Sequence, residues 1–128
     1  MAPLDVIRPY LDAAKRGDWD TAFGFFADDI ALRIPGRSEF AGEHRGKQVA
    51  IDYIRNARAR SEGADVELEL LDMLSSDERV ALLVRERFHR PEGVVEIRRA
   101  NVYRVAGEQI AEVWIFEGDQ YAVDELFA

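Results

Sequence analysis

Three segments in the first half of the chain place apolar side chains at helical spacing. The stripe of the first segment is Ile7, Tyr10, Leu11 and Ala14, and Gly17 ends it. Asp18 suits the N-cap of a second helix. The stripe of that helix is Trp19, Ala22, Phe23 and Phe26. A third stripe follows a polar loop over residues 36–46 and consists of Ala50, Tyr53, Ile54 and Ala57. The pattern therefore predicts three helices before residue 63.

After the third helix the chain alternates apolar and polar residues, which predicts strands. A short strand is already expected over residues 30–34, where Pro35 and Gly36 break it. Four longer strands are expected over residues 66–74, 80–89, 94–105 and 109–117. Short turns join these four, so they should be antiparallel neighbours. Residues 120–127 are expected to form either a short helix or an extended tail.

Helices followed by a run of strands indicate an α+β domain in which the helices cover one face of a curved sheet. The last strand carries apolar residues of both parities, with Val113 and Ile115 on one face and Ile110, Trp114 and Phe116 on the other. A sheet that is apolar on both faces needs something to bury each of them. We therefore expect the helices on the concave face and a second copy of the chain on the convex face.

Composition narrows the function classes. The 128 residues predict one domain over residues 1–128, and the net charge of −8 argues against a nucleic-acid partner, since acidic surfaces repel phosphates. The N-terminal residues carry charges every few positions, unlike a signal peptide or a membrane span. The chain has no cysteine, which excludes disulfides and thiol nucleophiles. We expect a soluble cytoplasmic protein.

The order of these segments, with RGDW at the second helix, FADD before the first strand and Pro-Gly after it, resembles the nuclear transport factor 2-like fold over essentially the whole chain. The stretches IPGRSEFAGEHRG and IAEVWIFEGDQYAVDELF are similar to the SnoaL-like group, named for polyketide cyclases. The resemblance implies a cone-shaped, curved, mixed or antiparallel sheet wrapped around three N-terminal helices, with an apolar pocket at its open end. It also implies homodimers through the outer sheet face.

The resemblance further implies cofactor-free chemistry on a small molecule, namely isomerisation, cyclisation or dehydration. Ketosteroid isomerases, which are relatives in this superfamily, hold an enolate oxygen with a tyrosine and a strand acid and move the proton with an aspartate before a proline. These positions correspond here to Tyr10, Asn101 and Ile34. A phenol and an amide can still donate hydrogen bonds, but isoleucine cannot take a proton.

In polyketide cyclases a carboxylate near the end of the last strands transfers the proton, and Asp119 is the nearest match. Asp119 has two interpretations. At an apolar pocket mouth it would be a desolvated general base. At the start of a closing helix it would be an N-cap that accepts backbone N–H groups. The sequence leaves both open.

The turn RPEG at residues 90–93 sets the register of two neighbouring strands. It places Val84 opposite Arg99 and Glu86 diagonal to Arg99. We expect an internal Glu86–Arg99 ion pair that closes the pocket, in preference to a substrate clamp. Epoxide hydrolysis, a third activity of the superfamily, would need paired acids around a water, and Glu86 with Arg99 only hints at it.

The candidate ligand-binding residues are Tyr10, Phe23, Ile34, Tyr53, Glu86, Arg99, Asn101 and Trp114. Parity also allows Trp114 to lie in the dimer face. The two histidines, His44 and His89, lack a third ligand nearby, so no metal or other cofactor is expected. The expected function is binding of an apolar, oxygen-bearing small molecule, with proton transfer by Asp119. The alternative is a non-catalytic ligand-binding or interaction module, which Ile34 at the usual base position supports.

Overall fold

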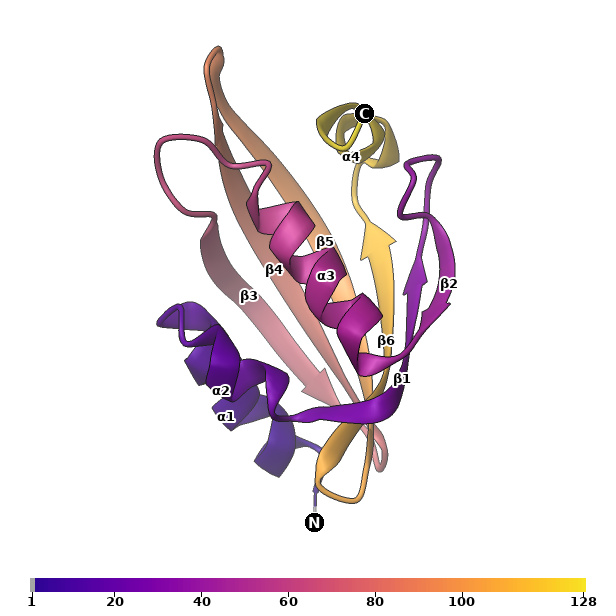
Figure 1. Cartoon of the computed structure of the whole chain (residues 1–128). Helices are drawn as coiled ribbons and strands as arrows, with labels where there is room; N and C mark the ends of the chain where they lie inside the picture. The colour runs from indigo at the N-terminus through magenta and orange to yellow at the C-terminus, as the bar shows by residue number, and fades with distance from the viewer. Residues whose placement is uncertain (1) are drawn as a thin grey trace.

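The computed structural model describes residues 2–128 and contains four helices and a curved sheet of six strands (Figure 1). The helices are α1 (Leu4–Lys15), α2 (Trp19–Phe23), α3 (Lys47–Arg58) and α4 (Gln120–Leu126). The strands are β1 (Phe26–Ile34), β2 (Gly42–Arg45), β3 (Glu67–Ser75), β4 (Arg79–Arg90), β5 (Gly93–Ala106) and β6 (Gln109–Glu117).

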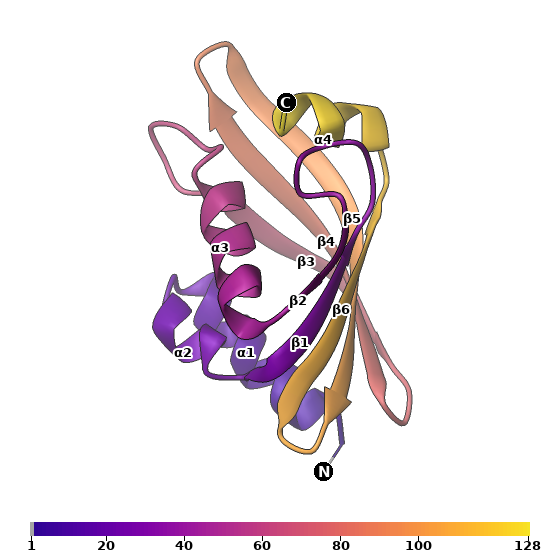
Figure 2. The same ribbon diagram turned by 45° about the vertical axis from the view of Figure 1, so that its right-hand side comes forward.

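The strands lie in the order β2-β1-β6-β5-β4-β3. Strands β1 and β6 run parallel, and the other neighbouring pairs are antiparallel. Helices α1, α2 and α3 lie on the concave side of the sheet, and α4 lies across its far end (Figures 1 and 2). The predicted fold class, a curved mixed sheet wrapped around three N-terminal helices, is confirmed.

The main core fills the space between these helices and the sheet. Its most deeply buried large side chains come from α1, β1, β4 and β6 and include Ile7, Phe26, Ile30, Leu82 and Ile110. A second cluster packs under α4 and consists of Phe88, Ile97, Val123, Leu126 and Phe127. Burial of one such side chain stabilises the folded state by about 1.5–3 kcal/mol. Burial of these side chains holds the helices against the sheet. The space between the helices and the middle of the sheet is only partly filled and contains a cavity.

Helix α1 ends where the sequence predicted, because Gly17 adopts a φ of +76° and its N–H and that of Asp18 return to the carbonyls of Ala14 and Ala13. The second helix is shorter than predicted. It ends at Phe23, and Phe26 begins β1 instead of completing the helical stripe. Phe26 is buried in either arrangement, and only its pairing with Ile110 of β6 makes it a strand residue.

Two other segments test the elements expected from the sequence, namely residues 42–45 and the closing segment. Residues 42–45 were expected in a loop but form β2, which pairs antiparallel with β1. Four mostly exposed residues carry no alternation that would predict a strand, so only the free edge of β1 induces it. The closing segment is a helix, α4, the first of its two predicted alternatives.

Strand β6 contains a bulge that changes which residues face the core. Ile110 pairs with Val105 but Val113 pairs with Tyr103, so Ala111 is an extra residue in β6. The bulge inverts the alternation, and Ile110 joins Val113 in the core. The prediction that Ile110 belongs to the outer face is therefore wrong. Trp114 and Phe116 do face outward, with 39% and 50% of their surface exposed.

Candidate functional site

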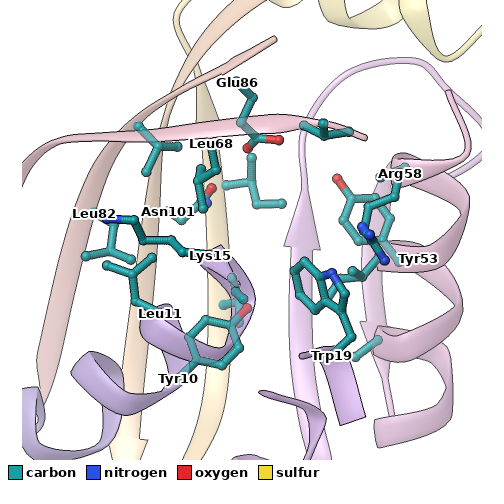
Figure 3. A pocket seen from close by; sticks show the side chains of 18 of the residues that line it. Tyr10, Leu11, Lys15, Trp19, Tyr53, Arg58, Leu68, Leu82, Glu86 and Asn101 are labelled. Atoms are coloured by element: carbon teal, nitrogen blue, oxygen red, sulfur yellow. The ribbon is translucent and has the colours of Figure 1, made fainter. Parts of the chain in front are cut away.

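A cavity of about 340 Å³ opens between the concave face of the sheet and helices α1, α2 and α3 (Figure 3). This volume lies in the range of small-molecule sites. Most of the lining is apolar and includes Leu11, Ile30, Leu68, Leu82, Val113 and Ile115. Such walls favour a ligand whose surface is largely apolar.

Glu86 of β4 and Arg99 and Asn101 of β5 bring polar groups into this lining. The register pairs Val84 with Arg99 and Leu82 with Asn101, as the RPEG turn predicted. Residues two apart on a strand share a face, so Glu86 points to the same side as Arg99. Figure 3 shows the Glu86 carboxylate directed into the cavity.

Arg99 is the centre of a buried charge cluster, with its side chain only 5% exposed. Its Nε and Nη2 donate to the two carboxylate oxygens of Glu117 on β6 at 2.9 and 2.8 Å. Its Nη1 lies 3.6 Å from Oε1 of Glu86. The predicted Glu86–Arg99 pair is thus confirmed, but Glu117 holds the shorter, two-point contact.

The surroundings of this cluster perturb its titration. Burial would lower the pKa of Arg99, but the charge of Glu86, together with Tyr53 and Glu117, outweighs it, so the pKa is raised and the guanidinium stays charged. Burial raises the pKa of Glu117 above its ordinary value, against the lowering effect of Arg99. Burial likewise raises the pKa of Tyr53. Arg99 therefore favours the charged form of Glu117, against the effect of burial.

Two tyrosines and an amide form a second polar group on the cavity wall. The rings of Tyr10 and Tyr103 lie 5.6 Å apart, and Asn101 lies beside Tyr103. Burial raises the pKa of Tyr103 to about 12 and that of Tyr10 well above its usual value, so both hydroxyls keep their protons at neutral pH. Within residues 2–128, the buried Oδ1 of Asn101 has no hydrogen-bond partner. A ligand donor could supply one.

The structure separates the candidate residues into two sets. Tyr10, Tyr53, Glu86, Arg99 and Asn101 line the cavity. The candidates outside its lining are Phe23, Ile34, Trp114 and Asp119.

Each residue outside the lining has another place. Phe23 and Ile34 are buried core residues, and from their part of the chain Trp19, Phe26 and Leu32 line the cavity instead. Trp114 faces outward beside Phe116 because its position on β6 alternates with Val113 and Ile115.

Asp119 caps α4. Its Oδ1 accepts the backbone N–H of Ala122 at 3.1 Å, and its extended backbone conformation is that of an N-cap residue. Asp119 is exposed. Of its two interpretations, this geometry matches the N-cap. The role of general base for Asp119 stays a prediction without a structural contact to support it.

Glu117 and Tyr103 are two residues of the site that were not predicted from the sequence. Glu117 shares its parity with the buried Val113 and Ile115, which could have indicated an inward carboxylate. Tyr103 shares its parity with Arg99 and Asn101 in the same way. Inward parity was the available signal for both residues.

The described residues also bear on metals and membranes. Across residues 2–128 no three histidine, aspartate or glutamate side chains gather as a metal site would require. None of the four described helices combines the length and apolar character needed to cross a bilayer.

Comparisons with known proteins agree with this fold. The SnoaL-like domain family matches residues 7–113. The uncharacterized protein Rv0034 of Mycobacterium tuberculosis is 30% identical over 128 residues, covering 99% of this chain and 97% of its own. A Xanthomonas campestris protein of unknown function with a cystatin-like fold superimposes with a TM-score of 0.88 at 23% identity, covering 100% and 99% of the two chains. TerC, co-crystallized with polyporic acid, gives 0.80 at 12% identity, covering 97% and 96%. The chain thus belongs to the SnoaL-like domain family, and it has the fold of solved nuclear transport factor 2-like proteins.

Proposed function

We propose that the cavity binds an apolar, oxygen-bearing small molecule and that Glu86 transfers a proton on it without a cofactor. The observation that carries the proposal is the Glu86 carboxylate in the wall of a largely apolar cavity. General bases act from such positions, within reach of a carbon or oxygen of the bound substrate. In this proposal Glu86 is the general base, the role that was predicted for Asp119 from the sequence.

The contacts of Arg99 leave Glu86 free to act. Arg99 gives its two short hydrogen bonds to Glu117, whereas its distance to Glu86 is 3.6 Å. The side chain of Glu86 is 15% exposed, and it lines the cavity. Glu86 is therefore positioned by a cation without being fully engaged by it, which supports a role for its carboxylate towards a ligand.

The polar group on the cavity wall supplies the second requirement of this chemistry. Removal of a proton next to a carbonyl places negative charge on the carbonyl oxygen, which needs hydrogen-bond donors. The protonated hydroxyl of Tyr10 on α1 and the amide of Asn101 on β5 are donors that line the same cavity. Isomerisation, cyclisation and dehydration all share this step, so the proposal names the step and leaves the final product open.

Epoxide hydrolysis receives less support from the geometry. It would use two acids around one water, and the second acid beside Arg99 is Glu117. The Glu117 side chain is 2% exposed and does not line the cavity. The two carboxylates therefore do not share the space in which a ligand would lie.

Hydrogen exchange tests the proposal without knowledge of the natural substrate. A panel of apolar enolisable ketones would be incubated with the protein in deuterium oxide, and deuterium next to the carbonyl would be measured by mass spectrometry. We expect exchange that Glu86→Gln lowers by about 10²–10⁴-fold, the usual contribution of a general base. Asp119→Asn is the matched control and should keep the wild-type rate. Loss of exchange in Asp119→Asn but not in Glu86→Gln would return the base to Asp119.

The second candidate function is ligand binding without catalysis. Ile34 at the usual base position supports it, and TerC, which shares the fold, was co-crystallized with polyporic acid. Binding of ketones by calorimetry together with no exchange by the wild-type protein would favour this function over proton transfer.

We also propose that the chain forms homodimers through an outer apolar patch, defined as Leu83, Ala100, Val102, Trp114 and Phe116. The register aligns these residues across β4, β5 and β6 in adjacent rows. The rings of Trp114 and Phe116 lie 6.0 Å apart, and both are substantially exposed. Sedimentation at micromolar concentration should show a dimer that Trp114→Glu converts to a monomer. A monomeric wild-type protein would contradict this.

A cytoplasmic location stays a prediction from composition.

A further inference from the structure

The mouth of the cavity is charged differently from its inner wall. Lys15 and Arg16 at the end of α1, Arg58 at the end of α3 and the acidic Asp65 all line the cavity. Lys15, Arg16 and Asp65 are exposed and Arg58 is half-buried, so this end of the cavity is its mouth. The inner wall instead carries Glu86 and Arg99, and Glu117 is buried behind Arg99 outside the lining. The chain as a whole is acidic, with a net charge of −8, so cations at the mouth are a local feature.

The three cations differ in how far they are already paired. Arg58 donates to Asp65 at 2.6 Å and lies over the ring of Trp19 at 5.0 Å. Arg16 lies 3.4 Å from Asp18. Lys15 forms no ion pair with any acidic side chain of residues 2–128. Figure 3 shows Lys15 and Arg58 on opposite sides of the cavity.

A lysine in the last turn of a helix ordinarily interacts with the negative end of the helix dipole and with water. Lys15 has that position in α1, but its side chain also lines the cavity. Its flexible stem can cover apolar surface while its ammonium group meets a polar end of a ligand. Lys15 is exposed and has no counter-ion among residues 2–128, so its ammonium group is available to an anionic group of a ligand at the mouth.

We propose that the ligand is an amphipathic monocarboxylate, whose carboxylate binds at the mouth against Lys15 and whose neutral oxygen lies at the inner wall. This inference deepens the proposed function and rests on it for the orientation of the ligand. The charges of Glu86 in the lining and of Glu117 behind it together exceed the single positive charge of Arg99, so this cluster disfavours an anion at the inner wall, whereas Lys15 attracts one to the mouth. The two ends of the cavity thus fix which end of the ligand enters first.

The helix directions favour a carboxylate over a phosphate. Phosphate sites commonly use the free N–H groups at a helix N-terminus. Helices α1 and α3 present their C-terminal ends to the mouth, where carbonyl groups disfavour an anion, and a doubly charged anion more strongly than a singly charged one. One unpaired ammonium group and one partly engaged guanidinium match a single negative charge.

Calorimetry with decanoate and decanol tests this inference, because the two probes share a chain and differ in charge. We expect wild-type protein to bind decanoate about fivefold more tightly than decanol, the size of a partly exposed ion pair. Lys15→Met should abolish that preference without weakening decanol. The chain has two lysines, and Lys47 at the start of α3 does not line the cavity, so Lys47→Met is the matched control.

Three results would overturn the inference: a preference for decanol, no binding of decanoate, or a decanoate preference that survives in Lys15→Met. None of these three results would contradict proton transfer by Glu86. Deuterium exchange into a neutral ketone that depends on Glu86 would keep the proposed function even if Lys15 proves irrelevant. Conversely, a Lys15-dependent decanoate preference together with no exchange would leave a binding protein for carboxylates.

Discussion

Replacement of Arg99 by methionine is the most informative test of the charge cluster. Methionine has a similar length but no charge, so Glu117 loses both hydrogen bonds at 2.9 and 2.8 Å and Glu86 loses its counter-ion at 3.6 Å. Both carboxylates would remain in place, and the Glu117 side chain is 2% exposed. The variant therefore leaves buried negative charge without a partner, which is costly.

The loss of unfolding free energy in Arg99→Met depends on the least costly way in which Glu117 can adapt to the loss of its partner. Removal of one partner of a buried pair costs about 3–5 kcal/mol. Glu117 can reduce that cost by taking up a proton. From its reference pKa of 4.5, protonation at pH 7 costs about 3 kcal/mol, at roughly 1.4 kcal/mol per unit. Glu86 can draw on water in the cavity. We therefore expect Arg99→Met to lower the free energy of unfolding by about 3 kcal/mol at pH 7.

The same reasoning gives the sign of the pH dependence. The pKa of Glu117 is raised in the folded protein, so the folded state binds a proton that the unfolded chain has released. Such a group favours folding below its unfolded pKa, and this contribution is lost as the pH rises through the folded pKa. Loss of Arg99 removes an effect that lowers this pKa, so it strengthens the trend. The deficit of Arg99→Met should shrink on acidification from pH 7 towards pH 5.

Urea denaturation followed by circular dichroism measures these differences. Arg45→Met is the matched control, since Arg45 is 68% exposed and pairs with Glu43 on the surface, and it should cost less than about 1 kcal/mol. Adding Glu117→Gln to Arg99→Met should recover a large part of the loss at pH 7. The reasoning fails if Arg99→Met stays within about 1 kcal/mol of wild type, or if its deficit is unchanged at pH 5.

Two further predictions concern the attachment of α4. Asp119→Ala should lower the free energy of unfolding by about 1 kcal/mol, because it loses the hydrogen bond to the N–H of Ala122. Asp119→Asn keeps a capping side chain and should change the free energy of unfolding by only a few tenths of a kcal/mol. Equal losses of the two variants in urea denaturation would contradict a stabilising cap at Asp119. Gly36→Ala should cost about 1 kcal/mol more than Gly42→Ala, because the side-chain ends of Asp124 and Gln120 would have to move and give up their mutual hydrogen bond and that of Asp124 to the N–H of Arg37. Both glycines have positive φ, at +99° and +110°, but only at Gly36 would a Cβ collide with Asp124 and Gln120. Equal melting temperatures of the two alanine variants would contradict the close packing of α4 on this turn.

The local patterns of the sequence determined a large part of this fold. Helical stripes located α1 and α3, because burial of one face stabilises a helix wherever the chain later folds. The RPEG turn determined the register of β4 and β5, and with it the Glu86–Arg99 pair, because a short turn fixes the pairing of its two strands. Tyr10 and Asn101 were found from the family resemblance and the inward parity.

Only the tertiary structure decided the features that depend on distant partners. The hairpin between β5 and β6 pairs Ala106 with Gln109, and unbroken pairing from there would place Phe116 opposite Arg99. The extra residue Ala111 shifts the register by one, and Glu117 becomes the partner of Arg99. Nothing local to Ala111 signals the bulge, since it forms because the apolar side chains of β6 must meet a core built by other segments. The same dependence on distant partners made Phe26 a strand residue, paired β2 with β1, and left Asp119 at a helix cap while Glu86 faced the cavity.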